Sequence, residues 1–481
     1  MDLRNLMIPN TWHASWDFKV AVLGLGKSGF SVADTLVELG SKVTVFAAKA
    51  EPELAELLDV IGAELIRSDS AEALDPSQFD FAVVSPGFAP SHPLVQKLTE
   101  SNLEIFTDID LAYRLGDKVK RPDWITITGT NGKTTTTQLT EAMLLADGKR
   151  VVACGNIGTP ILDVVREPQG YDYLVVELSS FQLHYSHSLG AKAAAFLNLA
   201  EDHYDWHGSE TAYHQAKAKI YQDAEIAIVY NVQDEKTRQA AEEADVIEGC
   251  RAIGFTTGMP ARSMVGYVEE FLVDRAFIEN RHEAALEICS AEDLAGFGVL
   301  SEHLKANIAA ATALARAVGV EASSIRRALK DFRLAGHRIE LVAERAGVTY
   351  VDDSKATNAH AADASLSSFD SVVWIAGGLL KGVDPKPLIE KHADRLRGCV
   401  VIGKDTQVLE ELFRTLIPEL PVRVITGDQT MVEAVRAASQ LAIAGDTVLL
   451  APAAASMDQF RDYEDRGNQF QEAVRGLDGN D

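Results

Sequence analysis

Short apolar runs alternate with longer amphipathic stretches along almost the whole chain of 481 residues. A short apolar run that is followed by an amphipathic stretch and a second apolar run is typical of βαβ units, in which parallel strands form a sheet between helices. The pattern therefore predicts an α/β protein with parallel sheets. Its length suggests two to four domains at roughly 100–200 residues each.

The predicted strands fall into three groups, and we expect one domain for each: 1–122, 123–334 and 335–481. The strands of the three groups are 19–24, 43–46 and 81–85; 124–128, 151–154, 173–178, 193–197 and 226–230; and 349–352, 372–376, 400–402, 422–426 and 447–450. Amphipathic segments predict helices that end near Leu39 and that cover 302–318 and 430–444. The polar stretch 116–123 resembles a linker, and 254–300 has a mixed pattern.

Charge and cysteine content narrow the class of protein. The net charge of −26 argues against a broad surface for nucleic acid or anionic membranes. The four cysteines include no CxxC pair, as expected for reduced thiols. No apolar run reaches the ~18 residues of a membrane span, and the first 18 residues lack the apolar stretch of a signal peptide. We expect a cytoplasmic protein that binds neither nucleic acid nor membranes.

The strongest chemical signal is a glycine-rich loop between a predicted strand and a predicted helix. It reads Gly129-Thr130-Asn131-Gly132-Lys133-Thr134-Thr135. Backbone N–H groups of such a loop can hold phosphate oxygens, and the helix N-terminus favours negative charge. Lys133 can pair with the terminal phosphates, and the Thr134 hydroxyl can reach Mg²⁺. Two residues separate the glycines, whereas the common P-loop has four.

Three further residues are candidates for a metal site near this loop. Glu177 ends a buried strand, and His203 follows the next strand of the same sheet, so both can point toward one ion. Lys217 lies in the segment AKAKIY. A strand-end glutamate is more often solvated, a single histidine is more often structural, and a lysine is more often a surface charge. The phosphate loop upstream favours the metal-binding interpretation for Glu177.

A second glycine-rich loop, GLGKSG at 24–29, follows the first predicted strand and fits GxGxxG. One interpretation is a dinucleotide site of a nicotinamide-dependent dehydrogenase. Such sites usually add an acidic residue about 20 positions later, and the segment FAAK at 46–49 has none. We therefore interpret the loop, with Gly26, Lys27 and Ser28, as a diphosphate site.

Together these motifs resemble the Mur ligase family from about Val20 to Arg475. The loop GTNGKTT is similar to the phosphate loop of that family. In the third domain the segment DSKATN at 353–358 is similar to the members that add D-glutamate, as are SPG at 85–87 and the following His92-Pro93. The resemblance implies a Rossmann-like N-terminal domain, a P-loop-type central ATPase domain and a doubly wound C-terminal domain.

The resemblance also implies roles for individual residues. Ser85, Pro86, Gly87 and Asn156 match positions that contact a UDP-sugar. Asn307 matches an adenine contact, Arg338 an arginine that reaches ATP, Asp353 a ribose contact and Lys355 a catalytic lysine near the phosphates. Thr357, Lys381, Ser456 and Tyr463 match a D-glutamate pocket. Leu304 stands where the family often has a second adenine-contacting asparagine, and the strand 43–46 lacks a common aspartate.

The implied activity is an ATP-dependent ligation that joins D-glutamate to UDP-N-acetylmuramoyl-L-alanine through an acyl phosphate, in peptidoglycan synthesis. Two Mg²⁺ ions are implied, one on Thr134 and one on Glu177, His203 and a carbamylated Lys217. Lys133, Lys217, His203 and Lys355 are the implied catalytic residues of a monomer. The alternatives are a Mur ligase for a different amino acid, a dehydrogenase, or a binding protein that retains an inactive site.

Overall fold

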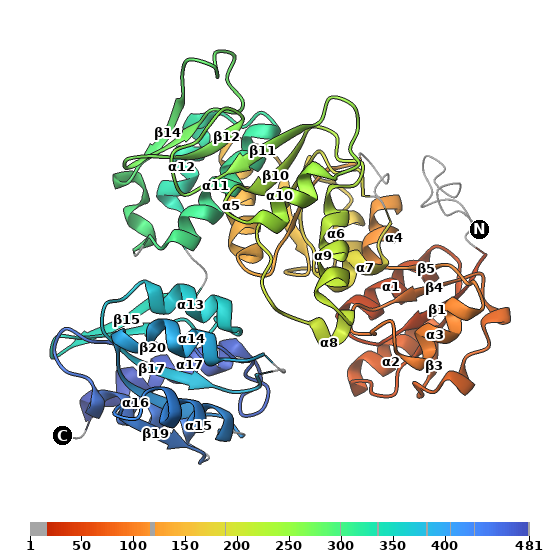
Figure 1. The fold of residues 1–481 in the computed structure, drawn as a ribbon. Coiled ribbons are helices and arrows are strands. Elements are labelled where there is room, and N and C mark those ends of the chain that lie inside the picture. Colours follow the sequence, from red (N-terminus) through yellow and green to blue (C-terminus); the bar gives the residue numbers. More distant parts are fainter. Residues whose placement is uncertain are drawn as a thin grey trace. The chain divides into compact units, whose positions relative to one another are not determined.

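The computed structural model describes residues 17–115, 121–187, 189–298, 300–333, 336–380, 383–404, 406–427 and 429–479 (Figure 1). These residues form two compact units. The first holds the described residues up to Leu199, together with Tyr204–Ala295 and Ala306–Phe332. The second holds Ala200–His203, the described residues of 296–305 and those from Arg333 onward.

The N-terminal part of the first unit is a five-stranded parallel sheet in the order β3-β2-β1-β4-β5. Alternating strand residues face opposite ways, so Val20 and Val22 pack under α1 while Ala21 and Leu23 pack on α3. The elements are β1 (Lys19–Leu23), α1 (Lys27–Glu38), β2 (Lys42–Phe46), α2 (Pro52–Ile61), β3 (Glu64–Ile66), β4 (Phe81–Val84), α3 (Pro93–Glu100), β5 (Ile105–Phe106) and α4 (Asp108–Leu115).

The middle part of the first unit is a nine-stranded sheet in the order β14-β13-β12-β11-β10-β9-β6-β8-β7. The strands are β6 (Asp123–Thr128), β7 (Val151–Gly155), β8 (Tyr173–Glu177), β9 (Ala193–Phe196), β10 (Ala227–Asn231), β11 (Arg251–Phe255), β12 (Met264–Val268), β13 (Phe271–Asp274) and β14 (Leu286–Ser290). The helices are α5 (Lys133–Ala146), α6 (Ile161–Val165), α7 (Ser180–Tyr185), α8 (Tyr204–His207), α9 (Glu210–Ala218), α10 (Glu235–Glu242), α11 (Glu302–Ala317, in this unit from Ala306 onward) and α12 (Ala322–Asp331).

The predicted α/β fold is confirmed, although the middle sheet has an antiparallel edge. Strands β12, β13 and β14 run antiparallel to one another and occupy the stretch whose sequence pattern was mixed. Tight connections of this kind carry no intervening amphipathic helix, so the alternation that identified the other strands is missing there.

The two parts of the first unit share one apolar core. Ile109 and Leu115 of α4 belong to the same cluster as Ile161 and Val165 of α6. Polar contacts flank this core: Arg166 pairs with Asp34 at 2.5 Å and with Glu38, both on α1. The N-terminal sheet and the middle sheet are therefore held together by packing as well as by charge.

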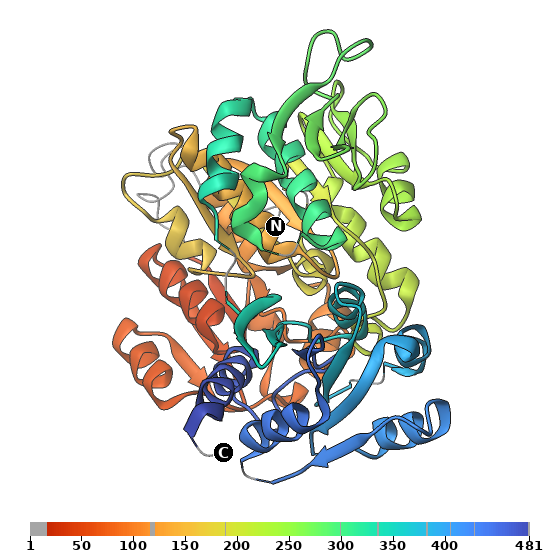
Figure 2. The same cartoon turned by 90° about the vertical axis from the view of Figure 1, so that its left-hand side faces the viewer.

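The second unit contains a six-stranded sheet in the order β15-β16-β20-β17-β18-β19, parallel except for β15. The elements of this sheet are coloured from cyan to dark blue in Figure 2. Trp374 packs against α13–α15 on one face, whereas Ile375 packs against α16 and α17 on the other. The elements are β15 (Glu340–Arg345), β16 (Val348–Asp352), α13 (Ala359–Ser367), β17 (Val372–Gly377), α14 (Lys386–His392), β18 (Leu396–Ile402), α15 (Gln407–Leu416), β19 (Val422–Ile425), α16 (Thr430–Leu441), β20 (Thr447–Leu450) and α17 (Tyr463–Arg475).

Among the described residues, no helix is both long and apolar enough to cross a membrane.

A buried ion pair ties α11 to the antiparallel edge of the middle sheet, and its loss should destabilise the fold. Arg316 Nε lies 2.9 Å from Asp274 Oδ2, and the Asp274 side chain is fully buried. Arg316→Ala should lower the free energy of unfolding by about 3–5 kcal/mol, because it leaves a buried carboxylate without its cation. Urea unfolding would measure this change.

The matched control is Arg238→Ala, which removes exposed contacts with Glu235 and Glu242. Exposed pairs of this kind contribute about 0–1 kcal/mol. Equal effects of the two substitutions would contradict the stabilising role of the Asp274–Arg316 pair.

Candidate functional site

The glycine-rich loop 129–132 follows β6 directly, and α5 begins at Lys133. Gly132 has φ +80°, and a Cβ at this position would lie 2.3 Å from Asn307 Oδ1. Only glycine fits there without moving Asn307. The loop therefore packs closely against α11, the helix that contains Asn307, the predicted adenine contact.

Asn198 holds the loop in place from the end of β9. Its side chain accepts a hydrogen bond from Asn131 N at 2.9 Å and donates one to Asn131 O at 3.1 Å. Its carbonyl oxygen also accepts from Thr130 N at 3.0 Å. The backbone of the phosphate loop is thus fixed by an asparagine that was not among the predicted site residues.

Two lysines meet at a single carbonyl oxygen of this loop. Lys133 Nζ and Lys217 Nζ each donate to Gly129 O at 2.8 Å, and Lys133 also donates to Thr130 O. Lys217 is buried, and its ammonium lies 4.8 Å from the centre of the Tyr213 ring. The structure therefore brings together two predicted residues that are 84 positions apart in the sequence.

Tyr213 connects the lysine segment to the loop a second time. Its hydroxyl lies 3.0 Å from Thr130 Oγ1, and its ring is buried. The sequence signal that could have identified it is its position one helical turn before Lys217, on the same face of α9.

Glu177 lies at the same edge of the middle sheet. In the parallel ladders, Ile127 of β6 and Gly155 of β7 are both in register with Glu177. Glu177 Oε1 accepts from Asn156 Nδ2 at 2.9 Å, whereas Oε2 is buried and has no hydrogen-bond partner among the described residues. A buried carboxylate oxygen without a partner is costly and suits a cation.

His203, the third predicted metal ligand, belongs to the second unit with Ala200–His203. Its Nε2 faces Asp202 Oδ2 at 3.5 Å, and its backbone has φ +54°. Its place beside Glu177 and Lys217 stays a prediction.

The second glycine-rich segment, 24–29, runs into α1, which begins at Lys27. A Cβ on Gly24 would lie 2.9 Å from Ser85 Oγ, and a Cβ on Gly29 would lie 2.2 Å from Gly24 O. These close approaches explain the two glycines, and they bring Ser85 of the predicted Ser85-Pro86-Gly87 segment against the loop. Gly26 begins the helix without a side-chain cap.

Asp108 is a buried carboxyl that contacts this loop. The Ser28 side chain forms a hydrogen bond with Asp108, and burial raises the pKa of Asp108 to about 6. Tyr185 of the middle part donates to Phe88 O at 2.8 Å, just after the Ser85-Pro86-Gly87 segment. Asp108 was missed because its partner is 80 residues away in the sequence.

In the second unit, Lys355 and Tyr463 lie in contact. The Lys355 ammonium is 3.5 Å from the centre of the Tyr463 ring, and Ser354 Oγ donates to Tyr463 O at 2.7 Å. Burial is the main cause that raises the pKa of Tyr463 to about 12, so this phenol stays neutral at physiological pH. Arg338 also lies within electrostatic reach of Tyr463.

Asp353, the predicted ribose contact, is buried between two donors. Its Oδ1 accepts from Ile339 N at 3.2 Å, and its Oδ2 accepts from Ser365 Oγ. Burial is the main cause that raises its pKa to about 6, against the opposing effects of Ser365 and Arg338. In this structure the carboxylate holds the backbone beside Arg338.

The remaining predicted pocket residues follow strand ends of the same sheet. Ser456 is buried and follows β20, while Thr357 follows β16. Leu379 and Ala455 form a bridge between the segments after β17 and β20. Lys381 lies outside the described residues.

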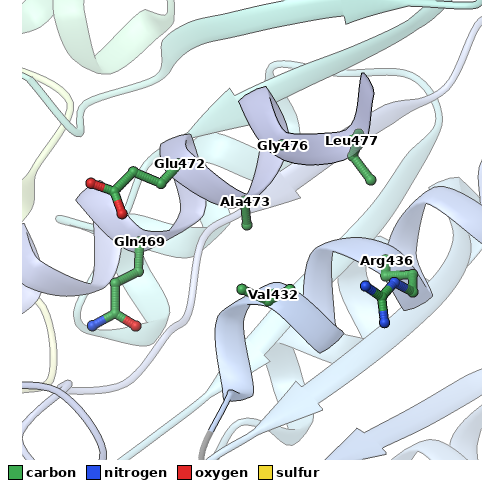
Figure 3. A pocket seen from close by; sticks show the side chains of 7 residues that line it. All are labelled: Val432, Arg436, Gln469, Glu472, Ala473, Gly476 and Leu477. Atoms are coloured by element: carbon green, nitrogen blue, oxygen red, sulfur yellow. The ribbon is translucent and has the colours of Figure 1, made fainter. Parts of the chain in front are cut away.

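A groove elsewhere on this unit runs between α16 and α17 (Figure 3). The residues that line it are Val432, Arg436, Gln469, Glu472, Ala473, Gly476 and Leu477. On α17 they belong to its second half and beyond, whereas Tyr463 is its first residue. This groove contains none of the predicted site residues.

A glycine-rich loop at a helix N-terminus, two lysines on its carbonyl and a buried carboxylate at the same sheet edge are typical of an α/β protein that binds nucleotide phosphates with a metal ion. Three family descriptions match the chain: a Mur ligase MurD-like N-terminal domain at 18–107, a Mur ligase middle domain at 127–315 and a Mur ligase glutamate ligase domain at 337–454.

Full-length relatives agree with these matches. UDP-N-acetylmuramoylalanine–D-glutamate ligase of Leifsonia xyli is 53% identical, covering 96% of this chain and 94% of the relative. The enzyme of the same name from Streptomyces avermitilis is 47% identical, covering 96% and 99%. The chain belongs to the Mur ligase family.

Solved structures share the fold. A UDP-N-acetylmuramate–alanine ligase from Thermotoga maritima matches with a TM-score of 0.57 at 17% identity, covering 95% of this chain and 99% of that one. A MurF ligase from the same organism, in complex with ADP, matches with a TM-score of 0.56 at 16% identity, covering 99% of both chains.

Proposed function

We propose that this chain joins D-glutamate to UDP-N-acetylmuramoyl-L-alanine at the expense of ATP, as a step of peptidoglycan synthesis. The observation that carries the proposal is the similarity to relatives named UDP-N-acetylmuramoylalanine–D-glutamate ligase. These relatives are 45–53% identical to this chain over nearly the whole of both chains. The phosphate loop with Lys133 and Lys217 supports the use of ATP.

The reaction begins when the L-alanine carboxylate attacks the γ-phosphate of ATP, which releases ADP and leaves an acyl phosphate. The D-glutamate amine then attacks the acyl carbon, and phosphate leaves from the tetrahedral intermediate. Several anions must approach one another in this sequence. Cationic groups offset their repulsion, and we assign this role to Lys133, Arg338 and Lys355.

Mg²⁺ neutralises phosphate charge and orients oxygens when it is bound. The chain offers a suitable ligand, because Glu177 Oε2 is a buried carboxylate oxygen that has no hydrogen-bond partner in the described part of the chain. We propose two ions, one held by Thr134 and one held by Glu177, His203 and a carbamate on Lys217.

The environment of Lys217 supports the carbamate. A buried ammonium on a metal site would repel the ion, whereas a carbamate is an anion with oxygen ligands. Lys217 Nζ is buried and already lies at the loop carbonyl of Gly129.

The substrate assignments follow the domains, which we propose to be 1–122, 123–334 and 335–481. Gly26, Lys27, Ser28 and the segment 85–87 would bind the UDP-sugar together with Asn156. Residues 129–135, Asn307, Arg338 and Asp353 would bind ATP. Thr357, Lys381, Ser456 and Tyr463 would bind D-glutamate. The acting form would be a cytoplasmic monomer, and sedimentation with substrates present would test the oligomeric state.

The first test supplies ATP and UDP-N-acetylmuramoyl-L-alanine with one candidate amino acid at a time. ADP should appear with D-glutamate and not with L-alanine, diaminopimelate or D-alanyl-D-alanine. Turnover that prefers another amino acid would overturn the assignment of D-glutamate.

Lys133→Ala should lower kcat at least ~10-fold, at about 1.4 kcal/mol per decade.

The carbamate predicts a distinctive pattern at Lys217. Lys217→Ala should remove most activity, and an added small carboxylate should restore part of it by supplying the missing oxygens. Lys217→Arg should be inactive, because a guanidinium forms no carbamate. The control is Lys219→Ala, which removes the hydrogen bond from a neighbouring lysine to His184 O. Full activity of Lys217→Arg would exclude the carbamate.

The D-glutamate pocket predicts a selective effect at Ser456. Ser456→Ala should raise KM for D-glutamate far more than KM for ATP. Losing one hydrogen bond to a charged group, at about 1.5–3 kcal/mol, corresponds to roughly 10- to 150-fold in kcat/KM. Ser371→Ala is the control. Ser371 precedes β17 and donates to Asp446, which precedes β20, whereas Ser456 follows β20. Equal small effects on all substrates would assign Ser456 to the fold instead.

A further inference from the structure

Arg338 lies between two residues with left-handed backbone conformations. His337 has φ +64° and Ile339 has φ +46°. Positive φ is unfavourable for residues with a Cβ, and it is a clear outlier for a β-branched residue such as isoleucine. A turn of this kind persists only where its surroundings hold it, and such strain is concentrated at functional sites.

Two consecutive aspartates at the end of β16 and just after it hold the two sides of this turn. Asp352 Oδ2 lies 2.6 Å from His337 Nδ1, and Asp353 Oδ1 accepts from Ile339 N at 3.2 Å. The His337 carbonyl accepts from Lys355 N at 3.2 Å. Each residue next to Arg338 is therefore fixed by its own carboxylate.

Helix α17 contacts the residues that hold this turn. Gln471 Nε2 donates to Asp352 Oδ2 at 2.9 Å and to Glu340 Oε2 at 3.1 Å. Glu340 Oε2 also accepts from His337 N at 2.8 Å. A Cβ on Gly467 would lie 2.2 Å from His337 Nδ1, so the imidazole packs directly on the helix backbone.

The same atoms could be considered as a metal site, because ligand atoms of His337, Glu340 and Asp352 all lie within 4.8 Å of one another. The hydrogen bonds argue against this. The Gln471 amide already donates to both carboxylates, and Asp352 is at hydrogen-bond distance from the imidazole nitrogen. Donors, and not a cation, satisfy these oxygens.

The charges around His337 favour its protonated form. Asp352 faces it from β16, Glu340 from β15 and Glu464 from α17, and the hydrogen bond to Asp352 is the main cause that raises the pKa of His337. The Arg466 guanidinium of α17 is the cation that acts on Asp352. The interaction of protonated His337 with Asp352 is intact below the raised pKa of His337, and it is lost as pH rises through that pKa.

We propose that Asp352 and Gln471 are positioning residues, which hold a protonated His337 and thereby fix the turn that presents Arg338. The proposal rests on the proposed function in one respect, the action of Arg338 on ATP. Neither residue needs to touch a substrate. The buried network acts through the backbone of the turn, which is why a neutral imidazole would weaken the presentation of Arg338.

The first experiment follows kcat/KM for ATP against pH in the Asp352→Asn variant. Removing the carboxylate charge lowers the pKa of His337, so activity should fall at a lower pH than in the unmodified chain. NMR titration of the His337 imidazole should show the same displacement. Gln471→Leu should lower kcat/KM for ATP while KM for D-glutamate changes little.

The control is Asp363→Asn, which removes the carboxylate charge from a partly buried histidine–aspartate contact of the same unit. His392 Nε2 lies 2.6 Å from Asp363 Oδ1, the same separation as in the His337 pair. This variant should keep the pH profile of the unmodified chain. An Asp352→Asn variant with an unchanged profile and an unchanged His337 titration would overturn the proposal. Absence of ligation in the unmodified chain would instead reject the proposed function.

A second experiment tests the contact with α17 by sterics. Gly467→Ala should lower kcat/KM for ATP roughly 10-fold by displacing the imidazole, although alanine favours the helix. In a His337→Ala background the same substitution should cause no further loss, because the ring is absent. Independent, multiplicative losses would show that Gly467 acts through something other than His337.

Discussion

The register of three parallel strands is the constraint on which the candidate site around the loop 129–132 depends. Strand β6 pairs with β8 on one side and β9 on the other, so that Ile127 is level with Glu177 and Thr128 with Phe196. The loop after β6, the carboxylate at the end of β8 and Asn198 after β9 consequently meet at one edge. A slip of one residue would turn Glu177 to the opposite face of the sheet.

Around that edge the chain concentrates positive charge within a protein of strongly negative net charge. Lys133 and Lys217 share the Gly129 carbonyl, whereas the buried Glu177 Oε2 at the same sheet edge has no hydrogen-bond partner within the described ranges. Two lysines at the loop and a carboxylate at the sheet edge would suit a ligand that contains both phosphate and a metal ion. Local charge, more than overall charge, decides what such a protein binds.

The sequence was sufficient for the elements that have a periodic pattern and for motifs that are contiguous. Strand β20 was predicted at its observed bounds, and the phosphate loop was placed correctly between β6 and α5. Strands β12–β14 could not be recognised, because antiparallel connections lack the amphipathic helix that separates parallel strands. Asn198, Tyr213 and Asp108 were missed for a different reason: each acts on a loop that is distant in sequence, and only the folded sheet brings the partners together.

The distribution of apolar clusters affects how such a chain can change during evolution. One cluster runs through both the N-terminal and the middle sheets, whereas the two clusters that sandwich the third sheet consist only of residues after 333. Recombination near residue 333 would leave those two clusters whole, whereas recombination near residue 122 would divide a shared one. Residues after 333 could therefore be exchanged between genes as a module, whereas the N-terminal and middle sheets would have to be inherited together.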